Sequence, residues 1–137
     1  MPQIAQLSSR ELRESVNSRL LDDGLLKRLA YFPRAQRALA FAHDKLPASI
    51  RLDAVAAHVG MSSAAFSRYF AGKIGITFSY AVRVLRIERA LAELEKSDCT
   101  IESLACQNGY QSGCAFTRAF KEVVGETPSE YRRRLLA

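Results

Sequence analysis

Two stretches of this chain decide its fold: LDAVAAHVG at residues 52–60 and IESLACQNG at residues 101–109. They begin 49 residues apart and place apolar residues, an alanine and a terminal glycine at the same positions. After one inserted residue the match continues at a spacing of 50. A recurrence of this length indicates two copies of one supersecondary unit. The pairs that continue it are Phe66 and Phe116, Arg68 and Arg118, Phe70 and Phe120, Gly75 and Gly125, Thr77 and Thr127, and Ser79 and Ser129.

Each copy predicts a helix, a tight turn and a second helix. The first helix is expected to end at Gly60 or Gly109, because a left-handed C-cap costs little without a Cβ. Ser62 or Ser112 then offers a side-chain oxygen that caps the second helix. In a helix-turn-helix the second helix can enter a major groove. A plain helical hairpin without a ligand is the alternative, and two copies with an arginine in phase weigh against it.

The spacing of apolar residues is helical nearly everywhere, so we expect an all-α fold. Ser8-Ser9-Arg10-Glu11 is a capping-box pattern that opens a helix over residues 8–21. Asp22-Asp23-Gly24 is expected to break this helix, and a short apolar stretch follows from Leu25 to Phe32. The predicted parts are an N-terminal helical extension at residues 1–33, a first helix-turn-helix subdomain at 34–76, a long connecting helix at 77–96 and a second subdomain at 97–137.

The connecting helix is expected to pack against both subdomains. Val84, Ile87, Leu91 and Leu94 mark one apolar stripe, and Phe78, Val82 and Leu85 mark a second. Its span, about 27 Å at 1.5 Å per residue, suits two helices that read one face of DNA about 34 Å apart. Arg83, Arg86 and Arg89 are interpreted as a solvated face that Glu88 and Glu93 partly neutralise.

Composition excludes several classes of protein and identifies none. The 20 Lys and Arg exceed the 14 Asp and Glu, giving a net charge of +6, yet residues 1–47 and 48–137 share this surplus equally. No apolar run reaches the 18 or so residues that span a bilayer, and the N-terminus lacks a signal core, so we expect a cytoplasmic, nucleoid-associated protein. Neither His43 nor His58 belongs to a nucleophile pattern, and the three cysteines form no CxxC motif. We therefore predict no enzyme, no cofactor and no metal site.

With these motifs, residues 34–137 resemble the DNA-binding region of the AraC/XylS family of bacterial transcriptional regulators. The resemblance implies two helix-turn-helix subdomains joined by one helix, each with a recognition helix in successive major-groove faces of one site. Two departures stand out: Ala81 lies where the family usually has an aromatic residue, and these 137 residues leave no space for the sensor domain of many members. The matching segments are residues 62–70, 75–78, 86–90, 101–105, 109–110, 112, 115–121, 125 and 127–132.

The faces of the two second helices predict the DNA contacts. Arg68 and Arg118 could each pair with guanine through the guanidinium fork, and the alternative is a solvated or phosphate-bound side chain. Because several neighbours are small, we expect fewer direct base contacts and more reliance on DNA shape and thymine methyl packing. The other base-contacting positions that the family implies are Ser63, Ala64, Ser67, Gly113, Cys114 and Thr117. The predicted phosphate contacts are Ser62, Ser112, Lys73, Lys121 and Arg132.

Several alternatives stay open at this stage. Residues 132–134 could instead form a basic helix end that suits the macrodipole. The chain could be the DNA-binding fragment of a longer regulator, or a protein-interaction module that lost DNA binding. Activation through RNA polymerase is implied by the resemblance, and the sequence does not separate activator from repressor. Binding as a monomer is favoured; Leu12, Val16 and Leu20 in residues 1–33 could form a strap on the first subdomain or a dimerising helix.

Overall fold

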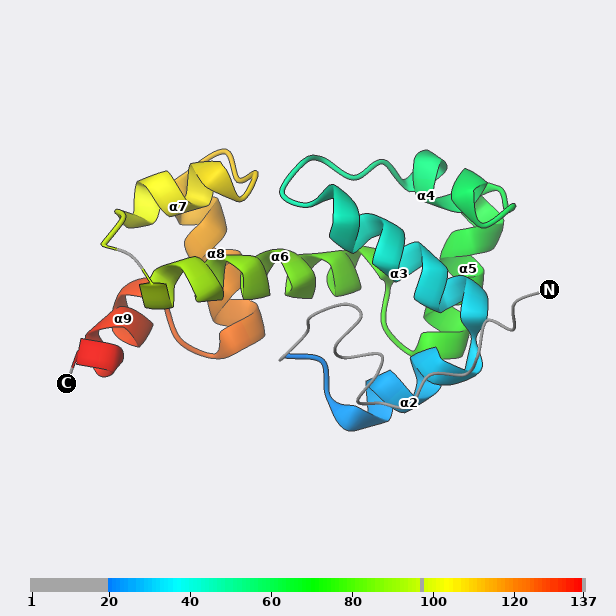
Figure 1. Cartoon of the computed structure of the whole chain (residues 1–137), viewed down its shortest axis with the longest axis horizontal. Coiled ribbons are helices and arrows are strands. Elements are labelled where there is room, and N and C mark those ends of the chain that lie inside the picture. Colours follow the sequence, from blue (N-terminus) through cyan, green and yellow to red (C-terminus); the bar gives the residue numbers. More distant parts are fainter. Residues whose placement is uncertain (1–19, 97, 137) are drawn as a thin grey trace.

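The computed structural model describes residues 20–96 and 98–136, and this part of the chain contains helices and no strand, which confirms the all-α prediction (Figure 1). Leu20 and Leu21, the end of the helix expected over residues 8–21, are not helical, and the rest of that prediction lies outside the described residues. The helices are α2 (Asp23–Tyr31), α3 (Pro33–Lys45), α4 (Leu52–His58), α5 (Ser63–Ile74), α6 (Phe78–Lys96), α7 (Ile101–Gln107), α8 (Gly113–Val124) and α9 (Pro128–Leu136).

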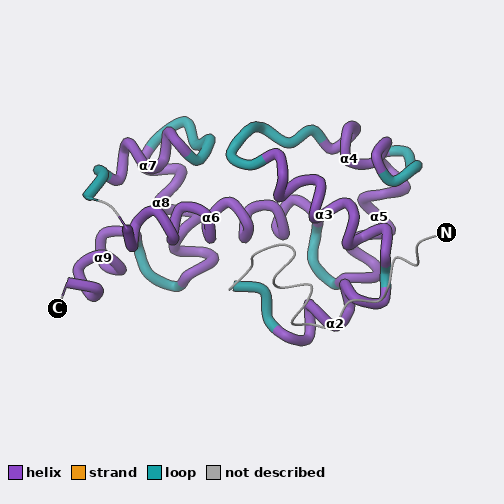
Figure 2. Tube along the Cα trace, in the orientation of Figure 1, coloured by secondary structure: helices purple, strands orange, loops and turns teal. Residues whose placement is uncertain are grey.

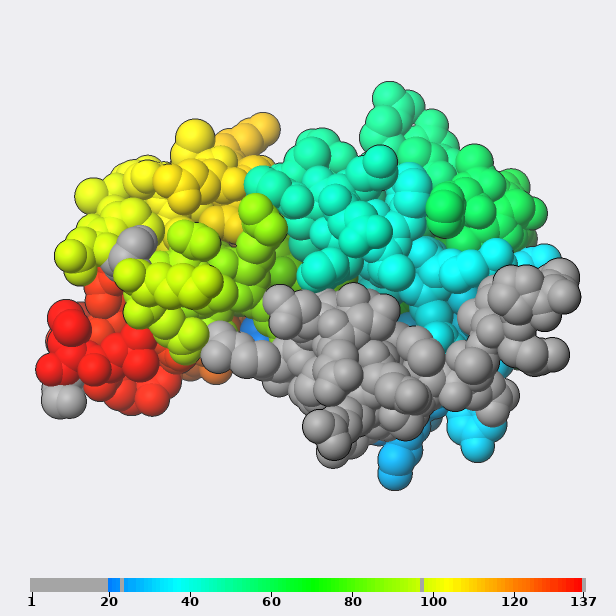
Figure 3. All heavy atoms as spheres, in the orientation of Figure 1, coloured from blue at the N-terminus to red at the C-terminus, as the bar shows by residue number. Residues whose placement is uncertain are grey.

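Helix α6 is the axis of the molecule. Helices α2 to α5 gather around its beginning and α7 to α9 around its end, so the chain forms two subdomains on one shared helix. In the tube view, α5 and α8 both run across the direction of α6, one near each end (Figure 2). The space-filling view shows the two subdomains as two lobes that meet over α6 (Figure 3). No helix in the described ranges is long and apolar enough to cross a membrane.

Each subdomain has its own hydrophobic core, and α6 contributes to both. The first core extends from Leu21 to Leu85, and the second from Ile87 to Phe120. Both predicted stripes of α6 are buried. The cores do not divide α6 by stripe, however: its buried apolar residues up to Leu85 join the first core, and those from Ile87 onward join the second. The position of a residue along α6 therefore determines which core its side chain joins, because the two subdomains follow one another along the helix axis.

The internal repeat appears as two helix pairs of equal length. Helices α4 and α7 have 7 residues each, and α5 and α8 have 12. The turn is one residue longer in the second copy, which is the inserted residue seen in the sequence. Gly60 and Gly109 follow the first helices with φ of 74° and 83°, values that a residue without a Cβ adopts at little cost. The predicted helix-turn-helix units are thereby confirmed.

Aromatic rings fill the space between the helices of each unit. Phe66 contacts Phe70, and Phe116 contacts Phe120, with ring centroids 5.9 and 5.8 Å apart. In the second unit Tyr131 adds an edge contact to Phe120. Its counterpart in the first unit is Ala81, the departure noted in the sequence. Phe78, one turn earlier on α6, fills this space instead, with centroids 5.0 Å from Phe66 and 5.1 Å from Phe70.

The segment before α3 differs from the expectation. Asp22, which was expected to break a helix, begins one: its side chain accepts a hydrogen bond from the backbone N–H of Leu25 and caps α2. Helix α2 packs against α3 and α5. From it, Arg28 donates to the carbonyl of Ile74, the last residue of α5, at 3.3 Å. The apolar stretch before Pro33 is therefore a helix of the first subdomain that supports the end of α5.

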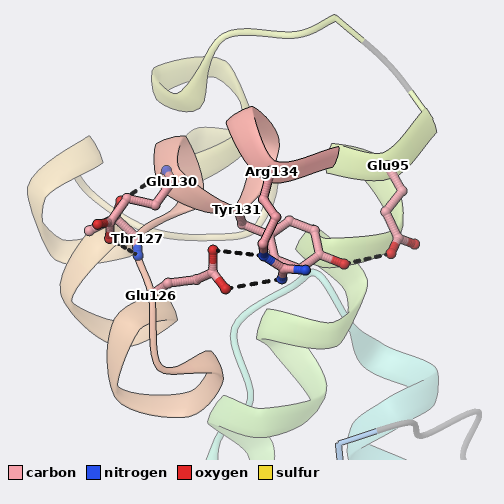
Figure 4. Close-up of polar contacts among 6 residues, drawn as sticks. All are labelled: Glu95, Glu126, Thr127, Glu130, Tyr131 and Arg134. Carbon is pink, nitrogen blue, oxygen red and sulfur yellow. Dashed lines mark hydrogen bonds and ion pairs between the residues drawn. The ribbon is translucent and has the colours of Figure 1, made fainter. Parts of the chain in front are cut away.

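Helix α9 closes the second subdomain with polar contacts (Figure 4). The hydroxyl of Thr127 accepts from the N–H of Glu130, and the Glu130 carboxylate accepts from the N–H of Thr127, which makes a capping box. The Thr127 amide holds the pKa of the Glu130 carboxyl below its usual range. Tyr131 donates to Glu95 near the end of α6 at 2.7 Å. These contacts fix α9 to the helix that both subdomains share.

Candidate nucleic-acid interface

The second helix of each unit begins with a serine cap. The Ser62 hydroxyl accepts from the N–H of Ala65 at 3.2 Å, and the Ser112 hydroxyl accepts from the N–H of Ala115 at 3.1 Å. A serine hydroxyl that accepts in this way still has its own O–H to donate. The first turns of α5 and α8 therefore offer a hydroxyl donor and the positive end of a helix to an anionic oxygen. Both serines are exposed, as a phosphate contact requires.

On α5, the predicted base-contacting residues share one outer face. Ala64 and Arg68 are exposed one turn apart, and Ser63 and Ser67 are half-buried beside them. Arg68 is the one long side chain in this set. The opposite face of α5 holds Phe66, Phe70 and Ile74 in the first core, and Tyr69 beside them is half-buried.

On α8, the corresponding face carries two cations. Cys114, Arg118 and Lys121 are exposed and Thr117 is half-buried. These four side chains line one shallow hollow of the surface, together with Ile101, Glu102, Gly113 and Thr127. On the inner face Phe116, Ala119 and Phe120 are buried. Val123 is half-buried at the edge of this core.

Gly113 does not fit the predicted base contact. It is buried, and the Glu102 carboxylate lies so close that a Cβ on Gly113 would stand 2.1 Å from Glu102 Oε1. The family's pattern places this position on the DNA-facing turn, but here an acidic side chain from α7 covers it. Gly113 is thus a site of close packing between α7 and α8.

The predicted phosphate-binding lysines lie on different sides of their helices. Lys121 is three residues after Arg118, about 60° away around the helix, and lines the same hollow. Lys73 is five residues after Arg68, about 140° away. Its ammonium lies 5.8 Å from the ring centroid of Phe32, within cation–π range. Only Lys121 extends the face that carries the arginine.

Two of the three arginines at residues 132–134 make contacts within the protein. Arg132 is half-buried and donates to the carbonyl of Cys99 at 2.6 Å, so its predicted phosphate contact does not fit. Arg134 pairs with Glu126 at 3.0 Å and lies over the ring of Tyr131 (Figure 4). Arg133 is exposed. These contacts support the alternative in which the run is a structural helix end.

The sequence interpretation missed a set of hydrogen bonds between the subdomains, which Arg86 donates and which we call the joint around Arg86. Arg86 on α6 was assigned to a solvated face, but its Nη1 donates to the carbonyls of Pro47 at 2.8 Å and Asn108 at 3.2 Å. Its Nη2 donates to the carbonyl of Ala48 at 3.3 Å. Burial lowers the pKa of this guanidinium, and the nearby Tyr110 opposes the change. No sequence signal marked this role, because the acceptors are backbone carbonyls that every residue carries.

Two neighbours of Arg86 on α6 also differ from the expected solvated face. Arg83 pairs with Glu122 of α8 at 2.8 Å. Glu88 is buried and accepts a hydrogen bond from the backbone N–H of Leu20. Leu20 in turn packs against both hydrophobic cores. Arg89 is exposed, as predicted.

In the part of the chain that the structure describes, no group of three or more His, Cys, Asp and Glu side chains is placed to hold a metal ion. The hollow on α8 combines a thiol, a hydroxyl and cations, and these groups are disposed for hydrogen bonding along a surface.

Comparison with known proteins gives the family. A helix-turn-helix domain model of the AraC type matches residues 55–134, which is more than half of the chain. The chain belongs to the AraC/XylS family. It is 35% identical over 98 residues to the transposon Tn10 TetD protein of Escherichia coli, and the match covers 72% of this chain and 71% of that protein. The family resemblance drawn from the sequence is thus confirmed, and with it a DNA-binding transcriptional regulator of the AraC type; the family and these relatives are regulators rather than enzymes.

Two further similar proteins are a much longer regulator and a DNA-binding domain that was solved in complex with DNA. It is 36% identical over 83 residues to an uncharacterized HTH-type transcriptional regulator of Staphylococcus aureus strain MRSA252, a match that covers 61% of this chain and 11% of that protein. The chain thus spans about a tenth of the length of such curated relatives. The DNA-binding domain of the global transcriptional factor AdpA, solved with a target DNA, superposes with a TM-score of 0.65 and 26% identity, covering 74% of this chain and 91% of that one.

Proposed function

We propose that this regulator binds one DNA site with α5 and α8 in successive major-groove faces. The observation that carries the proposal is the pair Arg68 and Arg118: both are exposed, and both occupy the same position of two repeated helices. An arginine that served only local packing would have no reason to recur in phase on the outer face of each unit. Helix α6, with 19 residues, is about 28 Å long, which suits two such helices about 34 Å apart once their own offsets are added.

In this proposal the two arginines read bases and the helix ends hold phosphates. Each guanidinium fork matches O6 and N7 of guanine, a contact worth about 1–3 kcal/mol of discrimination. Ala64 and Cys114 lie at equivalent positions, and their side chains are too short to reach deep into the major groove. They suit packing on thymine methyl groups. Ser62, Ser112 and Lys121 are the proposed phosphate contacts, with Lys73 at the margin.

The direction of regulation and the oligomeric state on DNA are proposed from the family. Activation by contact with RNA polymerase is the mode that we propose, together with binding as a monomer, since one chain carries both reading units. The relatives that extend far beyond the matched region favour a second possibility, in which this chain is the DNA-binding part of a longer regulator. A mass measurement of the native product distinguishes a regulator of this length from a longer one.

The test begins with selection of bound DNA from a random pool, followed by binding of the selected site to three variants. We expect Arg68→Ala and Arg118→Ala each to weaken the selected site by about tenfold or more and to relax preference at separate base pairs. Arg89→Ala, which removes an exposed arginine from α6, serves as the control and should leave binding nearly unchanged. Equal losses on selected and random DNA for both reader variants would contradict the assigned roles.

A salt titration distinguishes the remaining alternative. A DNA-binding protein that neutralises several phosphates loses affinity steeply as salt rises. A slope near zero would instead identify a protein-interaction module that kept the fold.

A further inference from the structure

Arg86 contacts the backbone of both subdomains from the helix that they share. Pro47 and Ala48 belong to the loop between α3 and α4 of the first subdomain, and Asn108 follows α7 in the second. All three carbonyls accept from one guanidinium, at 2.8 to 3.3 Å. A planar fork with fixed N–H directions holds its acceptors in a defined geometry. The loop and the turn are thereby fixed relative to each other, and not only to α6.

The packing around this joint is close. A Cβ on Gly109 would lie 2.8 Å from Arg86 Nη1 and 3.2 Å from the carbonyl oxygen of Pro47. At the equivalent Gly60 of the first unit, a Cβ would meet no atom within 4 Å. The turn that follows α7 therefore lies so close to Arg86 and Pro47 that a side chain at Gly109 would have to displace them. A second contact, between Arg83 and Glu122 of α8, ties the recognition helix itself to α6.

We infer that Arg86 is a positioning residue that fixes the spacing and the relative rotation of α5 and α8, and so the distance between the two DNA half-sites. This inference rests on the proposed function, in which both helices read one site. One inserted base pair moves a half-site by about 3.4 Å along the axis and about 35° around it. Two subdomains held rigidly cannot follow such a shift, whereas subdomains that lack the Arg86 contacts and are held mainly by their packing on α6 can adjust their relative rotation.

The first measurement uses DNA. The selected site is compared with duplexes that carry one base pair more or one fewer between the half-sites. We expect the native chain to lose about tenfold or more on the altered duplexes, as for a mismatched base pair, and Arg86→Gln to lose about threefold or less. Arg86→Lys should behave like Arg86→Gln, because one ammonium cannot reproduce the fork. Arg89→Gln, at an exposed position one turn away, should keep the native response.

The second measurement needs no DNA. Spin labels on Cys114 and on Ala64→Cys, in a chain with Cys99→Ser and Cys106→Ser, report the distance between equivalent positions of α8 and α5. We expect a narrow distance distribution in the otherwise native chain and in Arg89→Gln, and a distinctly broader one in Arg86→Gln and Arg86→Lys. Thermal unfolding of the same variants, each with both subdomains still folded, shows that a broader distance reports the relative position of the subdomains and not a loss of packing within one of them.

The outcomes separate the two proposals. Folded Arg86 variants with an unchanged distance distribution and an unchanged response to spacing would overturn the inference. If the native chain bound no selected DNA better than random DNA, the proposed function would fail, while the distance measurement would still decide the role of Arg86. Should Arg86→Gln not fold, Arg86→Lys, which keeps the charge, carries the test.

Discussion

The two helix-turn-helix units of this regulator share helix lengths, serine caps and paired phenylalanines, yet they are supported differently. The first unit lies in a core that also includes α2 and α3, and Arg28 supports the end of α5. The second has α7 to α9 and one end of α6, with a smaller set of buried residues. Its α8, however, carries two cations on one face, with Lys121 beside Arg118. The comparison suggests that the repeated sequence defines the unit, while residues outside the repeat decide how firmly each unit is held.

The largest expected effect contrasts the two cores. Phe70 and Phe120 are equivalent and fully buried, and replacing either by Ala should cost about 3–5 kcal/mol. Because the second core is smaller, we expect Phe120→Ala to unfold α7 to α9 while α2 to α5 stay folded, whereas Phe70→Ala should leave both subdomains folded. Amide hydrogen exchange followed helix by helix measures this. Equal loss of protection in both subdomains of Phe120→Ala would mean that they unfold as one unit.

A smaller effect contrasts the two turns. Gly60 and Gly109 both have positive φ, so Ala at either position pays about 1–2 kcal/mol for the left-handed conformation. Gly109→Ala must also displace Arg86 or the Pro47 carbonyl. We therefore expect Gly109→Ala to lower the free energy of unfolding by more than Gly60→Ala, as measured by urea unfolding. Equal losses in the free energy of unfolding would show that the contacts around Arg86 rearrange without lowering the stability.

The smallest effect contrasts the two lysines. Lys121 lies on the face of Arg118, and Lys73 lies over Phe32 on another side of α5. Lys121→Ala should reduce the slope of log affinity against log salt by about one, the share of a single phosphate contact. Lys73→Ala should reduce it less. A slope that falls more for Lys73→Ala would reverse the assignment of phosphate contacts between the two units.

Local signals in the sequence predicted most of the fold. Glycines and serines at fixed offsets gave the turns and caps of both units, and the observed helices keep the spacing of 49 and then 50 residues. The predicted connecting helix at 77–96 agrees with α6, Phe78–Lys96, except for one residue at its start. Helix α2 was missed because Asp22 is equally suited to break a helix and to cap the next one, and only packing against α3 and α5 distinguishes these roles.

The candidate interface was harder to predict where side chains bind the protein's own backbone. Arg86 and Arg132 have the same residue type as Arg68 and Arg118, but they donate to backbone carbonyls. Such contacts depend on distant segments that meet only in the folded chain. Gly113 was misplaced for a related reason: the family's pattern assigned it to DNA, and the sequence did not indicate that Glu102 of α7 covers it.

The division of α6 between the two cores also bears on how the chain folds. Every buried apolar residue of the first core precedes Ile87, and every one of the second follows Leu85, so the two cores occupy consecutive stretches that do not interleave. Contacts that are local in sequence close short loops and form quickly. As the chain leaves the ribosome, the first subdomain has all of its buried apolar residues before the second subdomain is made. The N-terminal half of α6, once packed, then gives the second subdomain a helix already formed on which to fold.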